Sequence, residues 1–237
     1  MTTEKLTGPI EDQTWAQRLQ SHVVTPEAAP RINGYDVEND LAKHYNFADT
    51  MMLCVLGDLP SDANRRAIEI ALQFAAPLSV AHAPTHAGML TRLCGGTRSA
   101  SFGAGALTLA EDARWLVEQH EPWLAWLKNP EGAPPAQFVA RNIEERASVT
   151  TLRNAIRRTG ATVPALDLDA ACVTKSAAIL SVFWSCGAQT PAQLELLFVL
   201  ARFACVGAEI LATRPAQFRT YPIDLPPFRF EAPHEAD

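Results

Sequence analysis

The sequence lacks the features that would mark a nucleic-acid-binding or membrane-inserted protein. Its 26 acidic residues outnumber the 20 basic ones, for a formal charge of -6, whereas nucleic-acid binding needs a basic surface. No apolar run reaches the ~18 residues of a membrane-spanning helix. The strongest candidate, Leu194–Leu200, is cut short by Arg202. We therefore expect neither a nucleic-acid partner nor a membrane partner.

Paired cysteines and metal-binding clusters are also missing. The five cysteines are odd in number and form no C-x-x-C pair, and the N-terminus has neither the basic start nor the apolar core of a signal peptide. A reduced cytoplasmic location fits this pattern. His82 and His86 have helical metal-ligand spacing, but Pro84 lies between them and no acidic third ligand is near. We expect no metal site.

Alanine is abundant and Val/Ile/Thr alternation is scarce, which predicts an all-α fold. Proline, glycine and capping residues delimit the expected helices. These are about 37–56, 61–77, 84–95, 99–115, a short helix after Pro122, 144–159, 168–186 and 191–212. The last two are apolar on all sides, so we expect them to be buried in the core or at a subunit interface.

Two groups of motifs bracket most of the chain. Near the N-terminus, Arg31–Asp36 reads R-I-N-G-Y-D and is followed by Phe47–Asp49, an apolar run and Leu59-Pro60. Near the C-terminus lie Ala201-Arg202, Arg214-Pro215 and Tyr221. Together they resemble the citrate synthase and citryl-CoA lyase family.

The resemblance implies a citrate synthase-like helical fold with a larger and a smaller lobe. It assigns 31–128 and 161–221 to the larger domain and 129–160 to the smaller lobe. The polar N-terminus itself predicts an arm over residues 1–30, and the prolines near the C-terminus predict an extended tail over 222–237. The resemblance also implies a homodimer, or a hetero-oligomer with a catalytically intact homologue. No tightly bound cofactor is expected; a CoA thioester would be a substrate or ligand.

The family's catalytic residues, two histidines and an aspartate, are substituted here. The aspartate removes the α-proton of a thioester, which leaves only if a base accepts it while a donor stabilises the oxyanion. Ser176 occupies that aspartate's position in our alignment. Residues 111–115 replace the turn of the first histidine, and residues 132–143, where the second belongs, contain none. We therefore predict no catalytic residue at the family positions.

Four carboxylates could serve as a relocated base: Asp167, Asp169, Glu145 and Glu209. Helix capping is the other interpretation of the two aspartates. Glu209 stands where the resemblance implies a histidine, and its charge would repel a bound carboxylate.

Arginines are the family feature that persists. Arg146, Arg202 and Arg214 match positions where the resemblance implies binding of substrate carboxylates, and guanidinium groups suit that role. Arg153, Arg157 and Arg158 lie where the resemblance implies CoA phosphates, although such a run also fits a solvated helix face.

Two functions follow as hypotheses. One is a catalytically degenerate citrate synthase-like or citryl-CoA lyase-like protein that acts as a non-catalytic or regulatory partner subunit and binds a tricarboxylate or CoA. The other is an active, divergent citryl-CoA lyase or citrate synthase-type acyltransferase that makes or breaks a carbon–carbon bond to an acyl-CoA.

Overall fold

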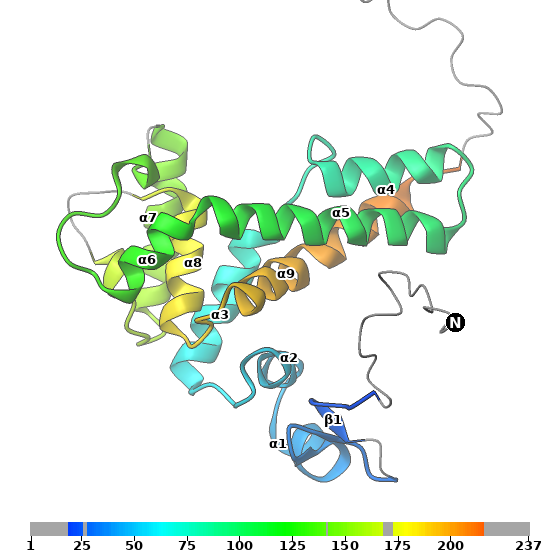
Figure 1. Cartoon of the computed structure of the whole chain (residues 1–237), viewed down its shortest axis with the longest axis horizontal. Helices are drawn as coiled ribbons and strands as arrows, with labels where there is room; N and C mark the ends of the chain where they lie inside the picture. The colour runs from blue at the N-terminus through cyan, green and yellow to red at the C-terminus, as the bar shows by residue number, and fades with distance from the viewer. Residues whose placement is uncertain (1–18, 26–27, 141, 168–172, 216–237) are drawn as a thin grey trace, which may run out of the picture. The chain divides into compact units, whose positions relative to one another are not determined.

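A computed structural model describes residues 19–25, 28–140, 142–167 and 173–215, and its chain divides into two compact units (Figure 1). The first comprises residues 1–60 and the second residues 61–237. The division falls at Pro60. The lobe boundaries expected from the resemblance stay a prediction.

The first unit begins with a small antiparallel sheet in the order β1-β2-β3, formed by β1 (Val24–Thr25), β2 (Arg31–Ile32) and β3 (Tyr35–Asp36). Asn33 and Gly34 connect β2 to β3 with φ values of 45° and 89°, as a two-residue hairpin turn requires. The R-I-N-G-Y-D motif is therefore this hairpin. The Asn33 amide anchors it by donating to the Leu53 carbonyl at 2.7 Å.

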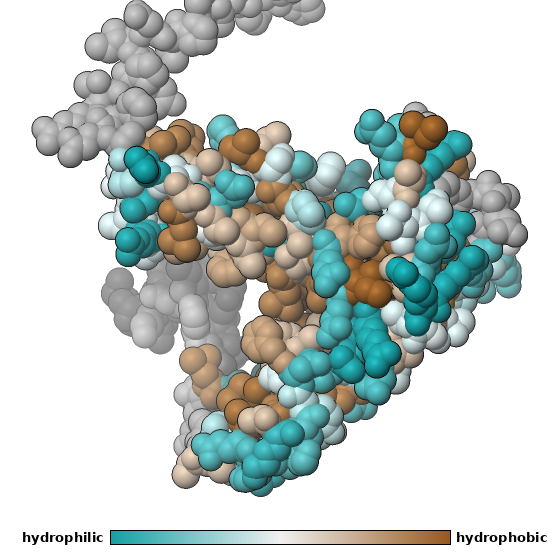
Figure 2. Space-filling model, turned by 180° about the vertical axis from the view of Figure 1, so that it is seen from behind, coloured by the Kyte–Doolittle hydropathy of each residue, from teal (hydrophilic) through white to brown (hydrophobic). Residues whose placement is uncertain are grey.

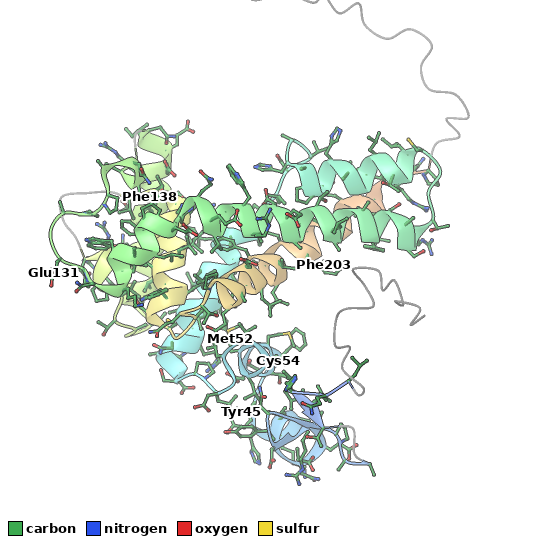
Figure 3. The ribbon with its side chains drawn as sticks, viewed as in Figure 1. Tyr45, Met52, Cys54, Glu131, Phe138 and Phe203 are labelled. Atoms are coloured by element: carbon green, nitrogen blue, oxygen red, sulfur yellow. The ribbon has the colours of Figure 1, made fainter. Side chains whose placement is uncertain are left out.

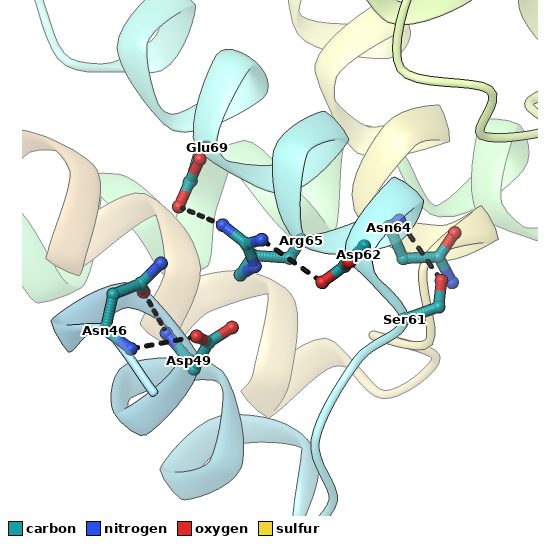
Figure 4. Close-up of polar contacts among 7 residues, drawn as sticks. All are labelled: Asn46, Asp49, Ser61, Asp62, Asn64, Arg65 and Glu69. Atoms are coloured by element: carbon teal, nitrogen blue, oxygen red, sulfur yellow. Dashed lines mark hydrogen bonds and ion pairs between the residues drawn. The ribbon is translucent and has the colours of Figure 1, made fainter. Parts of the chain in front are cut away.

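The helix predicted over 37–56 is interrupted, so that prediction was wrong in extent. A π-helical turn η1 (Val37–Leu41) and a short α1 (Ala42–His44) precede α2 (Phe47–Leu56). Asn46 is extended and caps α2 in a capping box: its side chain accepts from the Asp49 N–H at 2.9 Å, and the Asp49 carboxylate accepts from the Asn46 N–H at 3.0 Å (Figure 4). Local capping thus starts a new helix where periodicity indicated a continuous one.

The described part of the second unit is mainly helical. Its elements are α3 (Asp62–Ala75), α4 (Ala83–Leu93), α5 (Arg98–Gln119), α6 (Glu121–Lys128), η2 (Ala136–Phe138), α7 (Ile143–Arg157), η3 (Pro164–Leu166), α8 (Lys175–Ser185) and α9 (Pro191–Ala212).

Most of these helices lie where proline, glycine and capping residues predicted them. Ser61 caps α3 and is followed by the surface pairs of Arg65 with Asp62 and Glu69 (Figure 4). Thr190 caps α9 in a box with Gln193, and α9 has the predicted limits. The start of α8 differs. Thr174 is extended and caps a helix that begins at Lys175, and residues 168–172 lie outside the described part.

The long helix α5 organises the second unit (Figure 1). Its first half packs against α4 and α9, and α6, α7 and α8 gather at its C-terminal end. Glycine permits the close approach of α4 and α9: a Cβ on Gly88 would lie 2.3 Å from the Cδ1 atom of Ile210. Leu78, Leu109 and Val206 complete the apolar cluster around Ile210.

The two apolar helices differ in burial. Every residue of α8 from Ala177 to Phe183 is buried, and Phe183 packs edge-on against Phe198 of α9 at 5.6 Å between ring centroids. Helix α9 buries one side and exposes large apolar side chains on the other, including the labelled Phe203 (Figure 3). Apolar surface is visible between polar regions in Figure 2. Among the described residues, no helix is both long and apolar enough to cross a membrane.

Candidate functional site

A pocket of about 260 Å³ lies in the second unit, where the end of α3 meets the first turns of α7 and α8 and the middle of α9. Apolar side chains form part of its wall, and charged side chains from three helices and the Ser176 hydroxyl form the rest. The described residues that line it are Phe74, Ala75, Pro77, Glu145, Lys175, Ser176, Ile179, Phe198 and Arg202.

The first turn of α8 is held at this pocket by contacts of its backbone with the backbone and one side chain. The N–H of Thr174 donates to the Phe138 carbonyl at 2.7 Å, and Val139 pairs with Val173 in an antiparallel bridge. The carboxylate of Glu145 accepts from the Lys175 N–H at 2.9 Å. These contacts fix α8 against α7 and the segment before it, so the pocket wall is positioned by the fold.

Ser176, which the resemblance predicts at the position of the family's base, is paired with a histidine. Its Oγ lies 2.8 Å from Nε2 of His120, which occupies the junction of α5 and α6, 56 residues earlier in the chain. The imidazole stacks on the ring of Phe138, labelled in Figure 3, with 4.9 Å between centroids. Ser176 lines the pocket, whereas His120 contacts Ser176 and is not among the residues that line it.

The hydrogen bonds define the direction of the Ser176–His120 contact. Nδ1 of His120 lies 2.7 Å from the Leu116 carbonyl, which can only accept, so Nδ1 carries the proton. In the neutral ring Nε2 is then an acceptor, and the Ser176 hydroxyl donates to it. Burial lowers the pKa of His120, partly offset by the bond to Leu116. The neutral ring required for this arrangement is therefore favoured near neutral pH.

Two of the described residues that line the pocket, Lys175 and Arg202, are cationic. The Lys175 ammonium lies 5.9 Å from the Phe74 ring centroid. Burial and the nearby Arg202 charge lower the pKa of Lys175, while Glu145 opposes that shift. A carboxylate bound at the pocket would favour the charged ammonium by the same electrostatic rule.

Arg202 is fixed by three contacts. Its Nη1 donates to Asp112 of α5 at 2.7 Å, its Nε donates to the Ala75 carbonyl at 3.3 Å, and its guanidinium lies 5.0 Å from the Phe198 ring centroid. Burial lowers the pKa of Arg202 and Asp112 raises it. Asp112 offsets the Arg202 charge and Glu145 offsets that of Lys175, so the site combines cationic donors with little net charge.

The relocated-base candidates are scattered. Glu145 lines the pocket. Asp167 instead accepts from Arg157 at 2.9 Å, on the surface. Glu209 is exposed on α9, and Asp169 lies outside the described residues. Of the four, Glu145 alone is at the site among the residues that the structure describes.

The arginines expected to bind ligand are also separated. Arg202 lines the pocket, whereas Nε of Arg146 donates to the Ala140 carbonyl at 2.9 Å and Arg214 is exposed beyond the end of α9. Of the three expected at CoA phosphates, Arg157 is paired with Asp167 and Arg158 is exposed. The Nε atom of Arg153 is buried and meets no hydrogen-bond acceptor among the described residues. Their roles toward a ligand stay predictions.

Sequence reasoning did not find His120. It lies in none of the family motifs, and its partner Ser176 is far away in sequence, so no spacing connects them. Glu121-Pro122, which follows His120 in the sequence, indicates the start of a new helix but does not indicate where the imidazole lies. No group of three His, Cys, Asp or Glu residues in the described ranges is arranged to hold a metal ion.

Comparisons with known proteins identify the fold. Neither a protein-family model nor a curated protein sequence matches the chain. Among solved structures, it is similar to citryl-CoA lyase from Hydrogenobacter thermophilus, with 16% identity, a TM-score of 0.63, and coverage of 92% of this chain and 97% of that one.

The chain is also similar to two ATP citrate lyases. One is an aspartate-to-alanine variant from Methanosaeta concilii in complex with (3S)-citryl-CoA, with 15% identity and a TM-score of 0.58. The other, from Methanothrix soehngenii, is in complex with citrate and coenzyme A, with 14% identity and a TM-score of 0.55. The matches cover 95% and 96% of this chain but only 44% of each lyase. The expected all-α, citrate synthase-like fold is confirmed.

Proposed function

We propose that this protein is a citryl-CoA lyase-like subunit that has lost carbon–carbon bond chemistry of its own and binds a small carboxylate in the pocket between α3, α7, α8 and α9. It would act as a non-catalytic or regulatory partner, in a homodimer or with a catalytically intact homologue. One observation carries the proposal: the pocket wall presents the hydroxyl of Ser176 where the resemblance implies the carboxylate base.

A serine hydroxyl cannot replace that base. It would have to accept a carbon-bound proton near neutral pH, and the ordinary protonated hydroxyl is far too weakly basic for that. The Ser176 hydroxyl is moreover a donor to His120. This geometry supports loss of the proton-abstraction step.

Retained ligand binding is supported by the cations. Lys175 and Arg202 both line the pocket, and their ammonium and guanidinium groups form strong charge-assisted hydrogen bonds with carboxylates. Structural neighbours were solved with citryl-CoA, citrate and coenzyme A. Because Glu145 and Asp112 offset the two cations, we expect a modest affinity for citrate or a shorter dicarboxylate.

An oligomer is supported by the apolar side of α9. Leu196, Leu200 and Phe203 follow helical spacing and are 43%, 36% and 46% exposed in the single chain. Such a stripe is typical of a surface that a second subunit covers. Light scattering of the purified chain should give at least a dimer, and Leu200→Glu should shift the mass to that of a monomer.

Isothermal titration calorimetry with citrate tests the binding claim. Lys175→Met should weaken binding about tenfold or more, because a charge-assisted hydrogen bond contributes about 1.5–3 kcal/mol. Lys128→Met, which removes an exposed ammonium on α6, is the matched control and should leave the affinity unchanged. Loss of binding in Arg214→Met but not in Lys175→Met would place the ligand elsewhere and refute the assignment to this pocket.

A second function is favoured by Glu145. Among the candidates that the structure describes, it is the one that lines the pocket, so an active divergent lyase would use its carboxylate. The purified protein would then cleave citryl-CoA to acetyl-CoA and oxaloacetate, and Glu145→Gln would abolish this turnover while Glu209→Gln would not.

A further inference from the structure

We propose that Ser176 and His120 form a nucleophile–base pair that transfers short, carboxylate-bearing acyl groups from thioesters to water through an acyl-serine intermediate. This inference rests on the proposed carboxylate binding in the same pocket and goes beyond the proposed function, because it assigns the subunit a hydrolytic reaction in place of a purely non-catalytic role. It replaces the lost carbon–carbon chemistry with acyl transfer, a reaction that the residues present are suited to perform.

The geometry meets the requirements for an activated serine. The nucleophile and base must lie within hydrogen-bond reach, and a third group must orient the base. Ser176 Oγ and His120 Nε2 are 2.8 Å apart, and the Leu116 carbonyl holds Nδ1 at 2.7 Å. Stacking on Phe138 fixes the ring plane. The hydroxyl lies on the pocket wall with the base behind it, so a bound acyl group can reach Oγ.

The pocket also offers charge for the transition state. Attack on a thioester carbonyl develops an oxyanion, which nearby cationic donors stabilise. Lys175 and Arg202 line the same pocket. Lys175 and Ser176 are adjacent in the first turn of α8, where the helix dipole is positive. One cation can face the oxyanion and the other the free carboxylate of the acyl group.

The reaction balances with water as the only co-reactant. Ser176 Oγ bonds to the acyl carbon, and its proton passes to Nε2 of His120. The carbon–sulfur bond breaks, and the leaving thiolate takes the proton from Nε2. Water then attacks the acyl-serine and gives a proton to Nε2. That proton returns to Oγ as the ester bond breaks, which releases a carboxylic acid and regenerates the serine.

The chain contains an internal control for Ser176. Thr97-Arg98-Ser99 begins α5 as Thr174-Lys175-Ser176 begins α8: in both, threonine caps the helix, a cation follows and serine comes next. The Ser99 hydroxyl lies 3.0 Å from the Thr97 hydroxyl, and the corresponding distance at Ser176 is 3.5 Å. Ser99 is exposed, and Ser176 differs from it by having the imidazole and the pocket. Activation by a helix start alone would therefore affect both serines.

A fluorophosphonate probe tests the nucleophile without requiring a carboxylate-bearing substrate. Serine attack on phosphorus expels fluoride and leaves a stable adduct that peptide mass spectrometry locates. We expect labelling at Ser176 and not at Ser99, with loss in Ser176→Ala. His120→Gln should slow labelling roughly a hundredfold or more, in proportion to general-base assistance. Equal labelling of Ser99, or unchanged labelling in a folded His120→Gln variant, would overturn the proposal.

Thioester hydrolysis tests the substrate class. Thiol release from glutaryl-CoA should exceed that from pentanoyl-CoA, which has the same carbon chain without the carboxylate, by about tenfold or more. Lys175→Met should remove this preference, and Ser176→Ala should remove hydrolysis while retaining citrate binding. Retained binding without hydrolysis or labelling in the unmodified protein would refute this inference alone. Labelling without citrate binding would refute the carboxylate-binding proposal instead.

Discussion

The indole N–H of Trp123 donates to the hydroxyl of Ser181 at 3.1 Å, which joins α6 to the middle of α8. Both side chains are fully buried, and the Ser181 hydroxyl in turn donates to the Ala177 carbonyl at 2.7 Å. This contact fixes α8 laterally, whereas the contacts of Thr174 and Glu145 fix its first turn. Ser176 thus belongs to a helix that is held both at its first turn and at its middle.

Ser181→Ala should therefore destabilise the protein. The substitution leaves the buried indole N–H without an acceptor, which costs about 1–3 kcal/mol. Urea denaturation should show this loss in the free energy of unfolding. In a double-mutant cycle, Trp123→Phe should partly remove the cost of Ser181→Ala, because the unsatisfied donor is gone. Additive costs would contradict the hydrogen bond as the cause.

Asp112→Asn should lower stability and raise affinity. Arg202 would lose its charged partner in a largely buried site, for which we expect a loss of about 1–3 kcal/mol. The same change leaves the guanidinium charge uncompensated, so citrate should bind more tightly in calorimetry. The exposed pair of Arg114 and Glu111 gives a control, since Glu111→Gln should change neither quantity measurably. Weaker citrate binding in Asp112→Asn would contradict this assignment of charges.

His120 should make stability depend on pH. Burial lowers its folded-state pKa below the unfolded value of about 6.5, so the unfolded chain takes up the proton first as pH falls. The folded state therefore has its full stability above about pH 6.5, where His120 is neutral in both states. It loses stability as the pH falls through the folded-state pKa of His120. Denaturation at pH 7 to 5 should show stability falling by up to about 1.4 kcal/mol per pH unit from this group. His120→Gln should flatten that slope. An unchanged slope in the variant would exclude His120 as its source.

Gly88→Ala should disturb the α4–α9 contact. The new Cβ would lie 2.3 Å from Cδ1 of Ile210, which is confined by its cluster, and overpacking costs about 1–3 kcal/mol. Gly103→Ala on α5 is the matched control, because nothing lies within 4 Å of its Cβ position. It should stabilise the protein by up to about 1 kcal/mol through helix propensity. A higher midpoint of thermal denaturation for Gly88→Ala than for Gly103→Ala would contradict this packing.

The sequence predicted the helical fold because its signals are local. Proline, glycine and capping residues act over one helical turn, so the limits of α3, α4 and α9 follow from the residues beside them. Where a local cap competed with periodicity, as at Asn46, periodicity alone gave the wrong extent. The start of α8 failed for the same reason, since Thr174 caps a helix inside a continuous apolar run.

The site was less predictable because it depends on tertiary packing. Motif alignment led to Ser176, Glu145 and Arg202, and these three meet at one pocket. Motif alignment could not show that Asp112 forms an ion pair with Arg202, 90 residues away. Nor could it show that His120 is hydrogen-bonded to Ser176. Both contacts join helices whose mutual position is fixed by the core around them.

Product analysis with citryl-CoA tests most directly the proposal that this protein has no carbon–carbon cleavage of its own. The purified protein is incubated with citryl-CoA, and acetyl-CoA and oxaloacetate are quantified by mass spectrometry against a protein-free control. We predict neither product above the control, and citrate and free CoA as the only products of any turnover. Formation of acetyl-CoA and oxaloacetate in proportion to protein concentration, abolished by Glu145→Gln, would contradict the account.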